Sequence, residues 1–141
     1  MSSEKIQKIK STMAQRMIEH NRIIENSKYG KFIIQTNEVQ LLLILLILLK
    51  TNSPRKELKE YLEKSTLGNL IYSFNICAKN SGELSLINSL ESYSASRNAL
   101  AHKMYSKKKL TLKDCELAIN LGEEILKKIN TLLKPILPKN N

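Results

Sequence analysis

Residues 41–49 read LLLILLILL, a run of leucine and isoleucine that ends at Lys50. The run is far shorter than the roughly 20 apolar residues that cross a bilayer, so we expect no membrane partner. A helix that is apolar on every side is typical of the centre of a folded domain. We therefore expect residues 41–49 to form a helix that is buried on all sides.

The rest of the chain also favours helices. Glycine and proline number only 4 and 3 among 141 residues, and leucine, lysine and glutamate are strong helix formers. No stretch alternates apolar and polar residues, as a half-buried strand would. The sequence therefore predicts an all-α bundle of about five to six helices, forming a single domain over residues 1–134 with a frayed tail over residues 135–141.

Capping and turn residues give the expected bounds of these helices. Tyr29-Gly30 is expected to end the first helix, and Asn37 to cap the second. Thr66 is a candidate cap for the fourth, and Asn80-Ser81-Gly82 is the clearest turn. The predicted helices cover residues 4–26, 37–50, 54–64, 66–79, 83–105 and 111–133.

The formal net charge of +10 favours an acidic partner such as nucleic acid. Only four of the 23 basic residues are arginine, and the abundance of lysine, isoleucine and asparagine is also what an AT-rich coding sequence produces. Both explanations of the charge stay open. Cys77 and Cys115 form no CxxC or Cys/His pattern, so we expect reduced thiols in a cytoplasmic protein, with no metal and no cofactor.

The predicted helix at 83–105 carries the most informative pattern. Positions spaced by four and three residues place six side chains on one stripe: Leu86, Leu90, Tyr93, Arg97, Leu100 and Met104. An arginine on an otherwise apolar stripe is costly unless it is paired or binds a ligand. Arginine also offers the planar fork that suits phosphate, in a chain that otherwise prefers lysine.

Arg97 is followed by two further polar residues of interest. Asn98 and His102 are four residues apart and share a helical face, and the long side chain of Arg97 could reach the same edge of the helix. We therefore take Arg97, Asn98 and His102 as candidate catalytic residues. Four lysines come next and are candidates for nucleic-acid binding: Lys103, Lys107, Lys108 and Lys109. The alternatives are that these lysines belong to a solvated turn, that Arg97 caps a carbonyl, and that His102 is a core histidine.

The segment Arg97-Asn98-Ala99-Leu100-Ala101-His102 resembles the Arg-polar-x-x-x-His signature of HEPN domains, and Thr66-Leu67-Gly68 resembles a segment of some bacterial members. The resemblance covers roughly residues 35–133. It implies a helical bundle that dimerises through the motif helix, and a metal-independent endoribonuclease with a composite site. Such a protein would be a toxin or defence effector that acts on RNA, with an antitoxin protein as a partner.

One branch of these toxins carries a tyrosine two residues after the histidine, where this chain has Met104. The departure argues against that branch and leaves Tyr105 as a candidate accessory residue. Other HEPN members are non-catalytic modules that dimerise or bind nucleotides, and this alternative stays open. For the homodimer, the stripe that contains Leu90, Tyr93 and Leu100 is the expected contact.

The chemistry of the candidate residues agrees with the resemblance. RNA can be cleaved by its own 2′-hydroxyl when a base removes the proton and a positive charge stabilises the phosphorane. A histidine suits the proton transfer near neutral pH, and an arginine suits the developing charge. His102 and Arg97 could supply these two functions, and Asn98 could orient either the histidine or the phosphate.

Overall fold

The computed structural model describes residues 2–51, 55–105 and 112–137, with the side chains of residues 20–26, 55, 104, 105 and 112 left out of the description. Within these ranges the chain forms five helices and no strand, which confirms the prediction of an all-α bundle. The helices are α1 (Ser3–Lys50), α2 (Arg55–Glu63), α3 (Leu67–Cys77), α4 (Ser81–Tyr105) and α5 (Leu112–Leu133).

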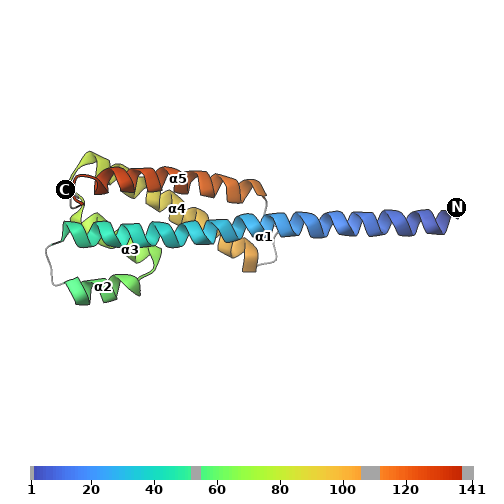
Figure 1. Ribbon diagram of the computed structural model, residues 1–141, viewed down its shortest axis with the longest axis horizontal. Coiled ribbons are helices and arrows are strands. Elements are labelled where there is room, and N and C mark those ends of the chain that lie inside the picture. Colours follow the sequence, from blue (N-terminus) through green and yellow to red (C-terminus); the bar gives the residue numbers. More distant parts are fainter. Residues whose placement is uncertain (1, 52–54, 106–111, 138–141) are drawn as a thin grey trace.

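The five helices pack as a bundle around the second half of α1. In this bundle α1 contacts α5, α3 and α2, while α4 packs against α3 and α5. Figure 1 shows α1 between α5 and α2, with α4 running in the opposite direction to α1. The C-terminal end of α4, which carries the candidate residues, therefore emerges at the end of the bundle where α1 leaves it.

The first two predicted helices are one continuous helix, so the break expected at Tyr29-Gly30 and the cap expected at Asn37 are both wrong. A glycine inside a helix costs only about 1 kcal/mol relative to alanine. Around Gly30 this cost is offset by packing, because Tyr29 is partly buried against the core and Phe32 is fully buried. Burial thus carries the helix through a residue that by itself favours a helix end.

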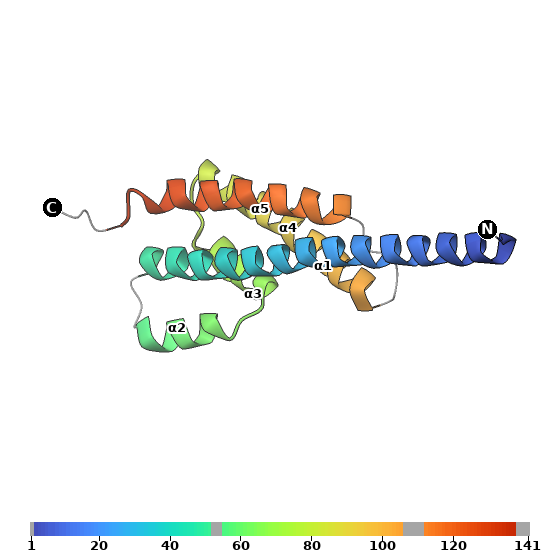
Figure 2. The same cartoon turned by 45° about the vertical axis from the view of Figure 1, so that its right-hand side comes forward.

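The first half of α1 projects beyond the bundle as a single helix (Figures 1 and 2). Its described side chains are all exposed as far as Glu19. We call residues 3–27 the arm. It carries large apolar side chains in water, among them Ile9 at 50% exposure and Met17 at 66%. The helix predicted over residues 4–26 therefore exists, but the exposed apolar side chains of its described part are not covered by the other described helices.

The run LLLILLILL is buried on one side only. Leu43, Leu46 and Ile47 lie in the core, whereas Leu41 is 66% exposed and Leu45 37% exposed. The expectation of burial on all sides is wrong because the other helices cover only the inner face of α1. By length and composition alone, Ser27–Lys50 could also cross a membrane, a test that the core helix of a soluble protein passes equally.

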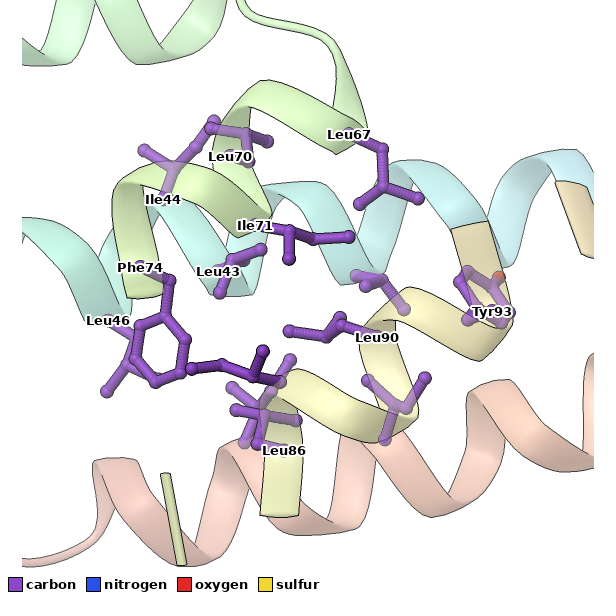
Figure 3. Close-up of a cluster of buried hydrophobic side chains, with 14 of the residues drawn as sticks. Leu43, Ile44, Leu46, Leu67, Leu70, Ile71, Phe74, Leu86, Leu90 and Tyr93 are labelled. Carbon is purple, nitrogen blue, oxygen red and sulfur yellow. The ribbon is translucent and has the colours of Figure 1, made fainter. Parts of the chain in front are cut away.

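The core is formed where α1, α3 and α4 face one another, with α5 closing it. Figure 3 shows side chains from these three helices pointing inward: Leu43, Ile44 and Leu46 of α1, Leu67, Leu70, Ile71 and Phe74 of α3, and Leu86, Leu90 and Tyr93 of α4. Each large apolar side chain buried in this way contributes about 1.5–3 kcal/mol. α5 adds Ile125, Ile129 and Leu133.

Side-chain caps begin two of the helices as the sequence suggests. The Thr66 hydroxyl accepts a 3.2 Å hydrogen bond from the backbone N–H of Asn69, which confirms Thr66 as the cap of α3. The Asn80 side chain accepts a 2.9 Å hydrogen bond from the backbone N–H of Glu83, so α4 begins at Ser81, slightly earlier than expected. The expected starts at Ser53-Pro54 and Thr111 lie outside the described residues.

An ion pair between Lys50 and Glu83 joins the end of α1 to the first turn of α4. Both side chains are largely removed from water, with Glu83 only 4% exposed and Lys50 15%. The pair therefore fixes the end of the bundle opposite the candidate site. At the C-terminus, Ile136 and Leu137 form hydrogen-bonded turns on Leu133, and the rest of the expected tail lies outside the described residues.

Candidate functional site

The predicted stripe on α4 faces the interior of the bundle. Leu86, Leu90 and Tyr93 are fully buried, and Leu100 is 3% exposed. Because these side chains form the core of their own chain, they are not available to a second copy. The expectation that Leu90, Tyr93 and Leu100 supply a homodimer contact is therefore wrong.

Tyr93 crosses the core to reach α1. Its hydroxyl donates a 2.8 Å hydrogen bond to Gln35 Oε1 and lies 3.1 Å from Thr36 Oγ, and its ring meets the edge of Phe32 at 5.2 Å between centroids. Burial raises the pKa of Tyr93 to about 12, although the Thr36 hydroxyl and the Arg97 charge act in the opposite direction. Tyr93 is thus a neutral structural residue at working pH.

Arg97 lies one helical turn beyond Tyr93, at the edge of the core. Its side chain is half-buried, and its charge is close enough to lower the pKa of the Tyr93 hydroxyl. Within the described ranges, Arg97 makes no hydrogen bond or ion pair, so the alternative that it caps a carbonyl does not hold there. A half-buried arginine with no partner in the described part of the chain is well suited to an anion, because an anion would accept charge-assisted hydrogen bonds from it.

His102 and Asn98 lie on a different face of α4. Both side chains are exposed, so the alternative of a core histidine is wrong. At about 100° per residue, His102 is roughly 140° around the helix axis from Arg97. No hydrogen bond among the described residues joins Arg97, Asn98 and His102. A single copy therefore presents the arginine and the histidine on separate faces of one helix.

An open groove of about 370 Å³ runs between α3 and α4 beside Asn98. Gly68 and Ile71 of α3 and Asn98 of α4 line it together, so residues from both of the segments quoted in the sequence analysis border this groove. Tyr72 and Asn75 complete the α3 wall, and Tyr72 is 67% exposed. Sequence reasoning did not single out Tyr72 as a functional residue. Ile76 on the same helix is 72% exposed, so exposure of an apolar side chain on α3 does not by itself distinguish Tyr72.

Lys103 has a structural partner. Its ammonium group lies 2.8 Å from Asp114 Oδ2, and this ion pair joins α4 to α5 with about a third of each side chain exposed. The charge of Lys103 is therefore partly compensated, although the side chain remains accessible. Lys107, Lys108 and Lys109 lie outside the described residues, as does the side chain of Tyr105.

Neither a metal site nor a disulfide is found in the parts of the chain that the structure describes. No three His, Cys, Asp or Glu side chains gather there. Cys77 is half-buried, and burial raises the pKa of its thiol, with the nearby Lys50 acting in the opposite direction. This thiol is thus less nucleophilic than an exposed cysteine, in keeping with a structural role.

Comparison with protein-family models, curated proteins and solved structures finds no match to this chain. The chemistry of Arg97 and His102, and the resemblance of the segment that contains them, are therefore the grounds for the function proposed next.

Proposed function

We propose that this protein is a HEPN-like, metal-independent endoribonuclease that acts in the cytoplasm as a toxin or defence effector, with RNA as its substrate. The observation that carries the proposal is Arg97. This half-buried arginine lacks a partner among the described residues, and an exposed histidine lies five residues further along the same helix. A phosphodiester would supply the anion that the arginine lacks.

In the proposed reaction, His102 removes the proton from a ribose 2′-hydroxyl. The 2′-oxygen attacks the adjacent phosphorus, the bond from phosphorus to the 5′-oxygen breaks, and the products are a 2′,3′-cyclic phosphate and a 5′-hydroxyl. Arg97 stabilises the negative charge that develops on the phosphorane oxygens. The leaving 5′-oxygen takes up a proton, which a second, protonated histidine would donate.

The second histidine is the reason for proposing a homodimer at α4. One copy offers one His102, and a two-fold contact beside it would bring a second histidine to the same place. Since the leucine stripe is buried, the available surface is the outer face of α4, where Ser92, Ala95 and Ala99 are exposed. These small side chains would allow two copies of α4 to approach closely. An antitoxin protein is the proposed regulator of this assembly.

A second candidate function is a non-catalytic RNA-binding module. The separation of Arg97 and His102 onto different faces of α4 favours it, because binding, unlike the proton transfers, does not need the two groups at one phosphate. In that case Arg97 and other basic side chains of this chain, whose net charge is +10, would bind the phosphates of the RNA backbone. The affinity for RNA would then fall steeply as the salt concentration rises.

Incubation of the protein with RNA in the presence of a chelator separates the two functions. Under the ribonuclease proposal the wild type cleaves, and His102→Ala and Arg97→Ala each lower the rate by about 100-fold or more. His20→Ala changes the only other histidine and serves as the matched control. Lys108→Ala is expected to weaken RNA binding and its salt dependence without changing the chemical step. If the wild type binds RNA and neither it nor any variant cleaves the RNA, the non-catalytic module is favoured.

A further inference from the structure

The arm of α1 presents an apolar face that no described part of the chain covers. Its members recur on one side of the helix: Ile6, Ile9, Met13 and Met17, with exposures from 41% to 66%. We call these four residues the arm stripe. Short isolated helices are marginal in water, and most helical stability in proteins comes from packing of an apolar face. The arm stripe therefore requires a partner.

The same helix carries a second uncovered apolar face where it enters the bundle. Ile34 is 70% exposed, Leu41 66% and Leu45 37%. We call these three residues the outer stripe. Its members are exposed and so lie outside the core, and Leu41 borders the groove between α1 and α2. α1 thus bears two apolar stripes of similar character, one before and one after the point where it enters the bundle.

The two stripes match one another in length and spacing. The arm and the bundled part of α1 are each about 35 Å long at 1.5 Å per residue. If two α1 helices pair in opposite directions with Ile6 opposite Leu45, then Met17 lies opposite Ile34, because both pairs are centred between residues 25 and 26. Steps of four and three residues from Met13, as coiled coils use, reach Met17, Ile34, Leu41 and Leu45, with polar residues at several positions between them, Lys31 and Glu38 included.

The charged residues on this seam favour the antiparallel direction. A parallel pair in register would place Lys31 against Lys31 and Glu38 against Glu38, which is unfavourable. In the antiparallel pair, Glu38 lies within one turn of Lys10 and Arg16 of the other helix, and Lys31 lies close to Glu19. All five side chains are exposed in the single chain and free to make these contacts.

We propose that two copies of this chain pair through antiparallel α1 helices, with the arm stripe of each copy packed on the outer stripe of the other. The contact is reciprocal, so it is closed by a two-fold axis near residues 25 and 26. It lies on a different helix from the proposed α4 contact and does not depend on ribonuclease activity.

Light scattering of the full-length protein tests the contact. Leu41→Lys places a charge at the centre of the outer stripe and should raise the dissociation constant of this contact by at least about 100-fold, halving the mass at micromolar concentration. Ile76→Lys changes an equally exposed side chain on α3 and is the matched control, expected to leave the mass unchanged. Glu38→Lys should weaken the contact, and Arg16→Glu in the same chain should restore it.

Cross-linking between two different variants tests the register. In a Cys77→Ser background, a mixture of Ile6→Cys and Leu45→Cys proteins should be joined by a short bismaleimide, whereas Ile18→Cys, on the other side of the arm, should not be joined to Leu45→Cys. A wild-type monomer at micromolar concentration, with or without binding to anionic vesicles, overturns the proposal. So does a mass that Leu41→Lys leaves unchanged. A dimer that cleaves RNA and that Leu41→Lys leaves intact would refute this contact and retain the ribonuclease. A dimer that cleaves no RNA and that Leu41→Lys separates would refute the ribonuclease and retain this contact.

Discussion

The Tyr93 hydroxyl donates a 2.8 Å hydrogen bond to the side-chain oxygen of Gln35, and so links α4 to α1 inside the bundle core. The Gln35 amide nitrogen in turn donates a 2.8 Å hydrogen bond to the carbonyl of Ile119 on α5. Three helices therefore meet at one buried glutamine, which is 8% exposed. Arg97 leaves the core one turn beyond this point, so the hydrogen bonds of Gln35 hold the helix that positions the candidate site.

Removal of the Tyr93 hydroxyl should destabilise the fold. Tyr93→Phe leaves the Gln35 oxygen buried without its donor, which costs about 1–3 kcal/mol of unfolding free energy. Tyr72→Phe removes a hydroxyl from a tyrosine that is 67% exposed and should change stability by less than about 0.5 kcal/mol. Urea denaturation of the three proteins measures both differences. Equal stability of Tyr93→Phe and wild type would show that the hydrogen bond contributes nothing.

The lack of a side chain at Gly122 leaves room for the Gln35 side chain against the backbone of α5. A Cβ atom at this position would lie 2.0 Å from Gln35 Oε1, so Gly122→Ala must displace a side chain that two hydrogen bonds hold in place. We expect a loss of about 1–3 kcal/mol. Gln35→Ala removes the obstructing atoms, and the double variant should therefore be more stable than the sum of the two single changes predicts. Strict additivity of the two changes in thermal unfolding would contradict this close approach.

Substitution of Gly30 by alanine should stabilise the protein, unlike the same change at Gly122. Gly30 lies inside α1, and a Cβ atom built there meets nothing within 4 Å. Gly30→Ala should raise the free energy of unfolding by about 0.5–1 kcal/mol, because alanine has the higher helix propensity. Circular dichroism during thermal unfolding checks this. A lower melting temperature for the variant would indicate that α1 is broken at Tyr29-Gly30, as the sequence alone suggested.

Removing one partner of the Lys50–Glu83 ion pair should lower the free energy of unfolding strongly, whereas replacing both residues with apolar ones should lower it little. Glu83→Gln leaves the largely buried Lys50 charge without its partner and should cost about 3–5 kcal/mol. Replacing both residues with apolar ones, Lys50→Met with Glu83→Leu, should recover most of this loss. The exposed pair of Lys59 and Glu63 is the control, and Glu63→Gln should cost less than about 1 kcal/mol. A similar loss of unfolding free energy for Glu83→Gln and Glu63→Gln would show that burial of the Lys50–Glu83 pair does not make its loss more destabilising.

Local signals in the sequence predicted the parts of the fold that local interactions determine. The Thr66 cap is found where expected, and the helix expected to follow the turn at Asn80 begins two residues earlier, at Ser81, with Asn80 as its cap. Both features depend on side chains within three residues of the helix start. The stripe of Leu86, Leu90, Tyr93 and Leu100 follows from helical periodicity and is buried as a unit. Such features can be read from the sequence because no distant part of the chain decides them.

The failed predictions are those that depend on which helix packs against which. Gly30 lies within a helix because Tyr29 and Phe32 pack on the bundle, and the uncovered side of Leu41 and Leu45 depends on where α2 and α5 lie. In the candidate site, the sequence identified Arg97 and His102, but it could not predict that the arginine would lie at the core edge and the histidine in solvent. That difference follows from the orientation of α4 in the bundle.

The most direct test of the proposed function is analysis of the RNA ends formed in the presence of a chelator by wild type and by His102→Ala. We predict that the wild type produces fragments with a 2′,3′-cyclic phosphate and a 5′-hydroxyl, that DNA is not cut, and that His102→Ala lowers the rate by about 100-fold or more while keeping the circular dichroism of the native fold. Cleavage by His102→Ala at the wild-type rate, or 3′-hydroxyl ends in place of cyclic phosphates, would contradict the assignment of His102 as the base.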